Sequence, residues 1–298
     1  MSAVVVPLVP AIAIRRMLYA TDFSAASNAA LPLVAALARR YGSEVYVVNI
    51  RSALPYTMAT PEAVCVIESQ GEREARAAMD EVLRSPDLEG LCTRVIVETG
   101  EPAEELKRAA RDYDIDLAVL GTHGRSGLMR LLMGSISEEL LRSLDCPVAT
   151  VGPHFSQTRI TPDMIKTILY PTDLSLESRA AFPYVASLAV EYRARIVLLH
   201  TILPGNAVTS IALETAALAR REMQRMFTSE VDPRSQFETV VDFGDPTQRI
   251  LESAHEYRAG LIAFGVQPAS TASTHFRNTV AYRVVLNADC PVLTCRSG

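Results

Sequence analysis

Short, almost continuously apolar segments alternate along the chain with longer segments in which apolar residues recur at helical spacing. Segments 116–120 and 196–199 contain almost no polar residue, which is typical of parallel strands buried on both faces. Such strands, alternating with helices, form right-handed βαβ units in a doubly wound sheet, so the pattern predicts an α/β protein. Pro32 and Pro183 predict a kink or a late start in the first helix of each half. In the first half we expect strands near 14–20, 44–50, 92–98, 116–121 and 147–151, and helices near 25–41, 68–84, 102–112 and 135–144.

The second half of the chain repeats the first. Four segments match in the same order: 17–24 with 168–175, 47–49 with 198–200, 100–102 with 244–246, and 145–148 with 289–292. The first two pairs are offset by 151 residues and the last two by 144, so the first copy holds seven more residues between positions 50 and 100. Because residues 152–162 are rich in proline and polar residues, we expect domains at 1–152 and 164–298 and a linker at 153–163.

Composition and charge narrow the class of protein. Of the 298 residues, 49% are hydrophobic and 21% are charged, which suits a folded globular chain and excludes a disordered one. The formal net charge of −5, without a run of five basic residues, argues against a nucleic-acid binder. Five cysteines without a C-x-x-C motif fit neither a disulfide framework nor a zinc site, and they indicate a reducing compartment.

Residues 1–14 are apolar and carry no charged side chain. Pro7 and Pro10 interrupt this stretch, and Arg15 and Arg16 follow it instead of preceding it as in a signal peptide. A membrane-spanning helix would need about 20 residues. We therefore expect a loose N-terminal extension, no membrane association and a cytoplasmic protein.

Two loops carry residues suited to ligand binding at the carboxyl ends of predicted strands, where open α/β sheets hold their ligands. Residues 21–24 follow the first strand, and residues 121–137 follow the fourth. Glycines at 121, 124 and 127 allow positive φ angles and the close approach of a ligand to backbone N–H groups. Gly134 and Ser135 open a helix whose free N–H groups and dipole favour a phosphate, and Ser135 and Ser137 add hydroxyl donors. The alternative is that the glycines only shape a loop.

The spacing of Gly121, Gly124, Gly134 and Ser135 matches the G-x2-G-x9-G-(S/T) nucleotide motif of the universal stress protein family. Segments 20–24 and 146–148 resemble the first-strand and last-strand motifs of that family, and the resemblance covers both copies. It implies two five-stranded parallel domains of the adenine nucleotide α-hydrolase type, each with strand order 3-2-1-4-5. It also implies a stress-response protein that binds ATP with Mg²⁺ in its first domain, through Ala20, Thr21, Asp22, Ser24, Asn49, Ile50, Gly121, Thr122, His123, Gly124, Gly134, Ser135, Ile136 and Ser137.

By the same resemblance, Asp22 and the strand end at Asn49 and Ile50 hold the adenosine part, and the glycine loop holds the phosphates. The second copy departs from the motif. Thr172, Asp173 and Gly265 are kept, but the residues aligned with Gly124, Gly134, Ser135 and Ser137 are Pro268, Asn278, Thr279 and Ala281. Proline removes a backbone donor, asparagine adds a side chain and alanine loses a hydroxyl, while Thr279 is conservative. We expect the second copy to bind no ATP.

Several signals of catalysis are missing from the sequence. It has no Walker-type G-x4-G-K-(S/T) motif, no lysine between 108 and 165 and no pair of histidines at helical i, i+4 spacing. Segment 124–127 is one residue short of a nucleophile elbow, and the acidic segment 112–116 lacks the later residues of a calcium loop. Without an evident base to orient water, fast ATP hydrolysis is not expected.

These observations favour a regulatory ATP-binding protein over two alternatives. The first alternative is an enzyme that uses the same site, as a slow ATPase or an adenylate- or phosphate-transferring protein. The second is an interaction protein whose sites are all idle. In the family, domains pair through their last strands, so the resemblance implies an intrachain pseudo-two-fold pair through 148–151 and 292–295. A homodimer of chains is compatible with the sequence, which does not argue for it.

Overall fold

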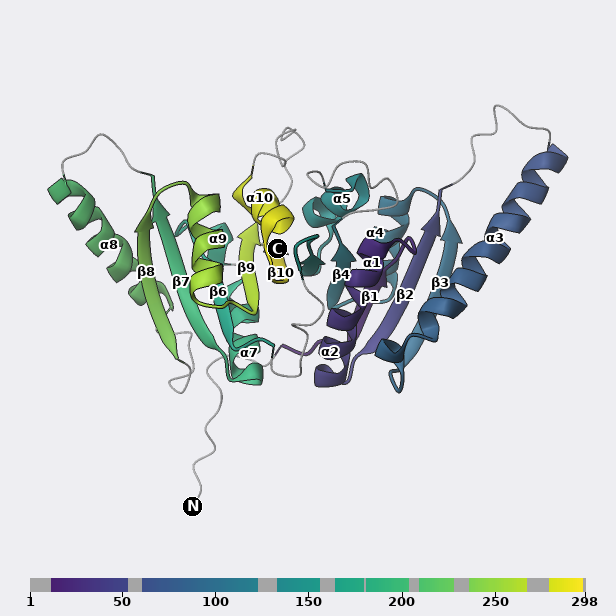
Figure 1. Ribbon diagram of the computed structural model, residues 1–298, viewed down its shortest axis with the longest axis horizontal. Coiled ribbons are helices and arrows are strands. Elements are labelled where there is room, and N and C mark those ends of the chain that lie inside the picture. The colour runs from purple at the N-terminus through teal and green to yellow at the C-terminus, as the bar shows by residue number, and fades with distance from the viewer. Residues whose placement is uncertain are drawn as a thin grey trace, which may run out of the picture. The chain divides into compact units, whose positions relative to one another are not determined.

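The computed structural model describes residues 12–52, 61–122, 133–155, 164–179, 181–203, 209–227, 236–266 and 279–296. The chain forms two compact units. Domain 1 is Ile14–Pro153, and domain 2 is His154–Gly298 together with Met1–Ala13. Both units have the α/β architecture that the alternating pattern predicts (Figure 1).

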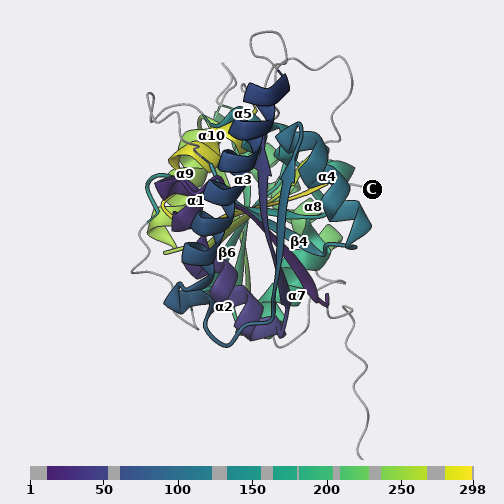
Figure 2. The ribbon, with the colours of Figure 1, turned by 90° about the vertical axis from the view of Figure 1, so that its right-hand side faces the viewer.

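Domain 1 contains one parallel sheet and helices on both of its faces. Its elements are β1 (Arg16–Ala20), α1 (Ala25–Ala29), α2 (Leu31–Tyr41), β2 (Glu44–Arg51), α3 (Pro61–Leu83), a 3₁₀ turn (Pro86–Leu88), β3 (Thr93–Thr99), α4 (Pro102–Asp112), β4 (Leu117–Gly121), α5 (Ser135–Ser143) and β5 (Val148–Val151). The strands run in the order β3-β2-β1-β4-β5, which confirms the predicted order. Figure 2 shows α2 and α4 on opposite sides of the strands. The order reverses between β1 and β4, where their carboxyl ends leave a crevice.

Domain 2 repeats this arrangement. Its elements are β6 (Thr167–Pro171), α6 (Leu176–Arg179), α7 (Phe182–Tyr192), β7 (Arg195–Ile202), α8 (Thr209–Phe227), β8 (Phe237–Phe243), α9 (Pro246–Glu256), β9 (Leu261–Val266), α10 (Val280–Asn287) and β10 (Val292–Arg296). The order β8-β7-β6-β9-β10 is again 3-2-1-4-5, and every pair is parallel. The seven additional residues of domain 1 lie between β2 and β3, as predicted.

The central strands are buried on both faces, as their unbroken apolar sequences predict. Met17, Leu18 and Tyr19 of β1 are at most 1% exposed, and Leu169 and Tyr170 of β6 are fully buried. None of the described helices is both long and apolar enough to cross a membrane.

Two helix boundaries bear on the predictions from the sequence. One is the interruption expected at the prolines, and the other is the start of the second helix. The first helix of each domain is interrupted just before its proline: α1 ends and α2 begins around Ala30, with Pro32 in the first turn of α2. The predicted start of the second helix at residue 68 is wrong, because α3 begins at Pro61. Val64 is buried but Val66 and Ile67 are 62% and 49% exposed, so the apolar side chains of this extension do not form the one-sided pattern that predicts a helix.

Candidate functional site

The loop that follows β1 is shaped by its own short side chains. Asp22 Oδ1 accepts a hydrogen bond from the N–H of Ser24, and Thr21 Oγ1 accepts one from the N–H of Phe23, both at 3.0 Å. Phe23 consequently adopts φ 63°, a left-handed conformation that bulky residues rarely take. Ser24 then caps α1, because its Oγ accepts from the N–H of Ser27 at 3.2 Å. These bonds hold Asp22 at the carboxyl end of β1.

Asn49 anchors the same loop from the neighbouring strand β2. Its Nδ2 donates to the carbonyl of Thr21 at 2.8 Å, and the residue is only 5% exposed. Because side chains alternate along a strand, Val48 and Ile50 point to the opposite face of the sheet from Asn49. Asn49 therefore supports the loop, while its two neighbours are available to a ligand.

Domain 2 builds the same loop, with Leu174 in place of Phe23 and a histidine in place of the asparagine that anchors it. Thr172 Oγ1 accepts from the N–H of Leu174, which has φ 67°, and Asp173 Oδ1 accepts from the N–H of Ser175, both at 3.0 Å. Burial opposes the charge of Asp173, but hydrogen bonds led by that from Ser175 outweigh it and lower the pKa of this carboxyl. His200 replaces the asparagine, and its Nδ1 lies 2.9 Å from the carbonyl of Thr172.

Gly121 is required by helix packing and not by a positive φ angle. Gly121 does not have a positive φ angle, so that expectation is wrong for this glycine. A Cβ at position 121 would lie 2.3 Å from the backbone oxygen of Ala26 in α1. The aligned Gly265 is in the same situation, because its Cβ would lie 2.2 Å from the carbonyl oxygen of Glu177. This close approach explains why the glycine is present in a copy that has lost the other two glycines of the motif.

The N-terminus of α5 is open in domain 1. Gly134 occupies the N-cap position with φ −59° and ψ 141°, and no described side chain caps the helix. The N–H of Gly134 donates to the carbonyl of Thr122 at 2.8 Å, which holds Gly134 next to the end of β4. Ser137 Oγ donates to the carbonyl of Gly121 at 2.9 Å, so this hydroxyl, expected to be a phosphate donor, already ties α5 to β4. The backbone N–H groups of the first turn are the donors that remain for an anion.

The corresponding end of α10 in domain 2 is closed by its own side chain. Thr279 is the N-cap residue, and its Oγ1 accepts from the N–H of Tyr282 at 3.2 Å. The helix therefore begins one residue later than α5 in the aligned sequence. Thr279 was expected to be a conservative replacement for Ser135, and this expectation is wrong because Ser135 lies inside its helix while Thr279 caps one.

A cavity of about 310 Å³ lies in domain 1 at the crevice beside β1 and β4. This volume is at the lower end of the range for small-molecule sites. Its walls are mostly apolar, and the open end of α5 and Asp22 supply the polar groups. The cavity is lined by Ala20, Thr21, Asp22, Ser27, Val48, Ile50, Pro102, Leu106, Leu120, Gly121, Gly134, Ser135, Ile136, Ser137 and Leu140.

Most of the residues predicted for the site line this cavity together. Three other predicted residues do not line the cavity. Ser24 caps α1, Asn49 holds the loop after β1, and Thr122 is fully buried at the end of β4. His123 and Gly124 lie outside the described residues.

The sequence reasoning missed the apolar walls of the cavity. Val48 lies two residues before the predicted Ile50, so the alternation of β2 alone could have identified it. Pro102 and Leu106 belong to the first turns of α4, and Pro102 is also the last residue of the repeated segment 100–102. Leu140 lies one turn after Ile136 on α5. Helical spacing from residues already chosen would have found Leu140.

The described lining contains one ionisable side chain, that of Asp22, and no lysine, histidine or cysteine. Burial raises the pKa of Tyr19, whose hydroxyl donates to the carbonyl of Ser27, to about 12. Burial likewise raises the pKa of the Cys146 thiol to about 12, so this residue is no ready nucleophile. Among the described residues no group of three potential metal ligands occurs.

Comparison with known proteins identifies the family. The model of the universal stress protein family matches residues 13–152 and again residues 164–296. The chain belongs to the universal stress protein family. Each of its domains is thus one copy of the universal stress protein domain.

Individual relatives agree with this assignment. The universal stress protein MJ0531 of Methanocaldococcus jannaschii is 28% identical over 138 residues, which are 46% of this chain and 81% of the relative. YxiE of Bacillus subtilis, also a universal stress protein, is 28% identical over 144 residues, which are 46% of this chain and 97% of the relative. The crystal structure of a universal stress protein from Archaeoglobus fulgidus has a TM-score of 0.71 at 19% identity, and covers 95% of this chain and 98% of that one. This last likeness supports the fold of both domains.

Proposed function

We propose that this universal stress protein is a regulatory ATP-binding protein that binds one nucleotide, in domain 1. The observation that carries the proposal is the contrast between two aligned helix ends. The N-terminus of α5 opens onto a cavity without a side-chain cap, whereas Thr279 caps α10. An uncapped helix N-terminus is a natural phosphate site, because its N–H groups and dipole both favour an anion.

The side chains and backbone groups that line the cavity fit a nucleotide. The apolar side chains of Val48, Pro102 and Leu106 suit the flat base, and the β1 loop offers the Asp22 carboxylate to donors of the adenosine part. The phosphates would then lie toward Gly134 and Ser135. One carboxylate cannot hold Mg²⁺ by itself, so the metal would be held mainly by phosphate oxygens and water.

ATP acts here as a signal and not as a substrate that is turned over quickly. The described lining offers no lysine, no histidine and no paired carboxylates that could orient and deprotonate water. A cytoplasmic location, the stress response and an intrachain pairing of 148–151 with 292–295 belong to the same proposal, and they rest on the family resemblance.

Mass spectrometry of the nucleotide released from protein purified without added ligand tests the proposal. We expect ATP in the released fraction, and a rise in melting temperature when ATP is added back. At 100 times its dissociation constant a ligand adds about 2.7 kcal/mol to the free energy of unfolding. For a domain of this size the shift is roughly 5–10 °C. Protein that releases no adenine nucleotide and shows no shift with ATP would refute the proposal.

A further inference from the structure

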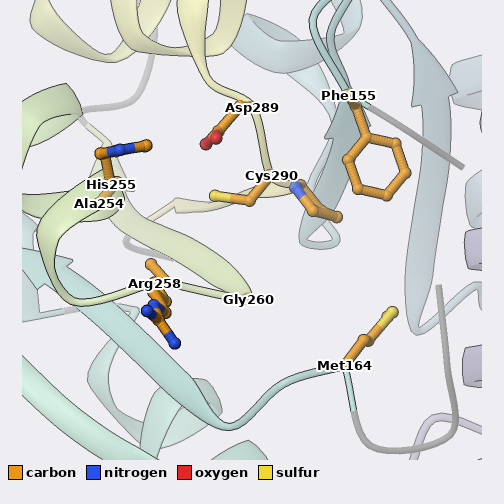
Figure 3. A pocket seen from close by; sticks show the side chains of 10 residues that line it. Phe155, Met164, Ala254, His255, Arg258, Gly260, Asp289 and Cys290 are labelled. Carbon is orange, nitrogen blue, oxygen red and sulfur yellow. The ribbon is translucent and has the colours of Figure 1, made fainter. Parts of the chain in front are cut away.

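Domain 2 has a cavity of about 580 Å³ at the amino ends of its strands, away from the crevice where open α/β sheets hold ligands. Met164, Gly260 and Pro291, which lie just before β6, β9 and β10, contribute to its walls (Figure 3). Asp289, the acidic residue of this cavity, already has an interaction partner in the chain. We therefore assign no ligand to the cavity. Unmatched groups lie instead on the outer faces of two helices, α3 and α8.

The helices α3 and α8 cover the edge strands of the two sheets. In domain 1, α3 packs on β3 and β2, and in domain 2, α8 packs on β8 and β7. Among the described residues, these two helices carry four of the ten large apolar side chains that are exposed. They are Val66 and Ile67 in α3, and Leu213 and Leu218 in α8, each between 49% and 64% exposed. Exposed apolar side chains that gather on one element indicate an interaction surface, whereas single scattered ones do not.

Each helix presents an apolar side chain and a charged side chain on one exposed stripe. In α3 Ile67 precedes Glu74 by seven residues, and in α8 Leu213 precedes Arg220 by seven. Seven residues are almost two full turns, so the two side chains of each pair lie on one face, about 10 Å apart along the helix axis. Glu74 and Arg220 are both exposed. The two stripes therefore have the same spacing and opposite charges.

The charges of the two stripes are not neutralised within their own helices. Glu74 Oε1 accepts a hydrogen bond from the Gln70 amide at 2.9 Å, but in the part of the chain that the structure describes neither Glu74 nor Arg220 makes an ion pair. Over its whole length α3 has six acidic residues and two arginines, whereas α8 has three arginines and two glutamates. A contact between α3 and α8 therefore brings together surfaces of opposite charge.

We propose that α8 of one chain docks on α3 of a second copy, with the two helices parallel. Leu213 packs on Ile67 of the second copy, and Arg220 pairs with Glu74 of the second copy. Ala217 lies between Leu213 and Arg220 on the same stripe, and its small side chain lets the two helices approach closely. None of these residues lines the cavity of domain 1, so this contact is separate from the proposed nucleotide site.

Pairing of either helix with its own counterpart is disfavoured. Two parallel α8 helices would place their Arg220 side chains next to each other, and two antiparallel ones would place Leu213 of each helix next to Arg220 of the other. Two α3 helices would meet the same conflict at Glu74. Because the proposed contact joins two different surfaces, a pair of chains keeps one free α3 and one free α8. Association then continues to a ring or to an open series of chains.

Sedimentation velocity of the full chain from about 1 μM to 1 mM tests the proposal. We expect the mean sedimentation coefficient to rise with concentration. Leu213→Glu sets a carboxylate against the acidic α3, and Ile67→Arg sets a cation against Arg220, while glutamate and arginine both favour the helix. Each variant should weaken association at least about tenfold. The matched control is Leu176→Glu, at a leucine of α6 that is 78% exposed, and it should associate as the wild type does.

A mixture of the two variants separates the proposed contact from a symmetric one. The Leu213→Glu chain keeps an intact α3 and the Ile67→Arg chain keeps an intact α8, so the mixture should form heterodimers that neither variant forms alone. A symmetric contact would be weakened in at most one variant and would not be restored by mixing. Three results would each overturn the proposal: sedimentation that is independent of concentration, unchanged association of either variant with a native circular dichroism spectrum, or a mixture that associates no more than the separate variants.

Discussion

Replacement of Ser135 by proline isolates one backbone donor of the proposed phosphate site. Ser135 is the first residue of α5, a position where proline is well tolerated, and the extended ψ of 141° at Gly134 suits a following proline. The substitution removes one N–H and leaves the helix intact. We expect the free energy of unfolding of the ligand-free protein to change by no more than about 0.5 kcal/mol.

The expected loss of ATP affinity follows from the hydrogen bond that is removed. A bond from an N–H to a charged group contributes about 1.5–3 kcal/mol. The dissociation constant for ATP should therefore rise roughly 10- to 150-fold. Ser135→Ala, which deletes the hydroxyl but keeps the N–H, should have a much smaller effect. Isothermal titration calorimetry measures all three proteins.

Val280→Pro is the matched control, because Val280 is the first residue of α10 and Thr279 also has an extended ψ of 152°. It removes the equivalent N–H from the domain that we expect to bind no ATP. Its dissociation constant should equal that of the wild type. If Ser135→Pro binds ATP as tightly as Ser135→Ala, the open end of α5 is not the phosphate site.

Three further predictions concern the supports of the site and its chemistry. Gly121→Ala and Gly265→Ala should each lower the free energy of unfolding by about 1–3 kcal/mol in denaturant titrations, because a Cβ would strike the backbone of α1 or α6; an unchanged midpoint would contradict the packing role. Asn49→Ala should cost about 1–3 kcal/mol by leaving the buried carbonyl of Thr21 without its donor, and Asn49→His should recover most of this loss, as His200 suggests. Phosphate release under saturating ATP and Mg²⁺ should stay far below the ~1 s⁻¹ of ordinary enzymes, and a rate near that value would favour the ATPase alternative.

The alternation of strands and helices could be predicted from local patterns of the sequence, whereas the strand order and most of the site residues came from the resemblance to the family. Apolar runs such as 117–120 are typical of buried strands, and the same alternation of strands and helices occurs in both copies of the repeat. The glycine motif likewise places Gly134 and Ser135 at a helix start, where the structure has them.

What could not be predicted depends on contacts between distant segments. Gly121 meets α1, which lies about 95 residues earlier in the chain, and no local pattern reveals that contact. The shift of the helix start to Val280 depends on whether the Thr279 hydroxyl turns to its own backbone or to a ligand. A residue type does not specify that choice.

The stoichiometry of ATP binding, measured by calorimetry on the full chain, tests the central claim most directly. The open α5 and the capped α10 predict about one ATP per chain, with binding that Ser135→Pro weakens and Val280→Pro does not. Two equivalent sites per chain, or a single site that only Val280→Pro weakens, would contradict the assignment of the nucleotide to domain 1.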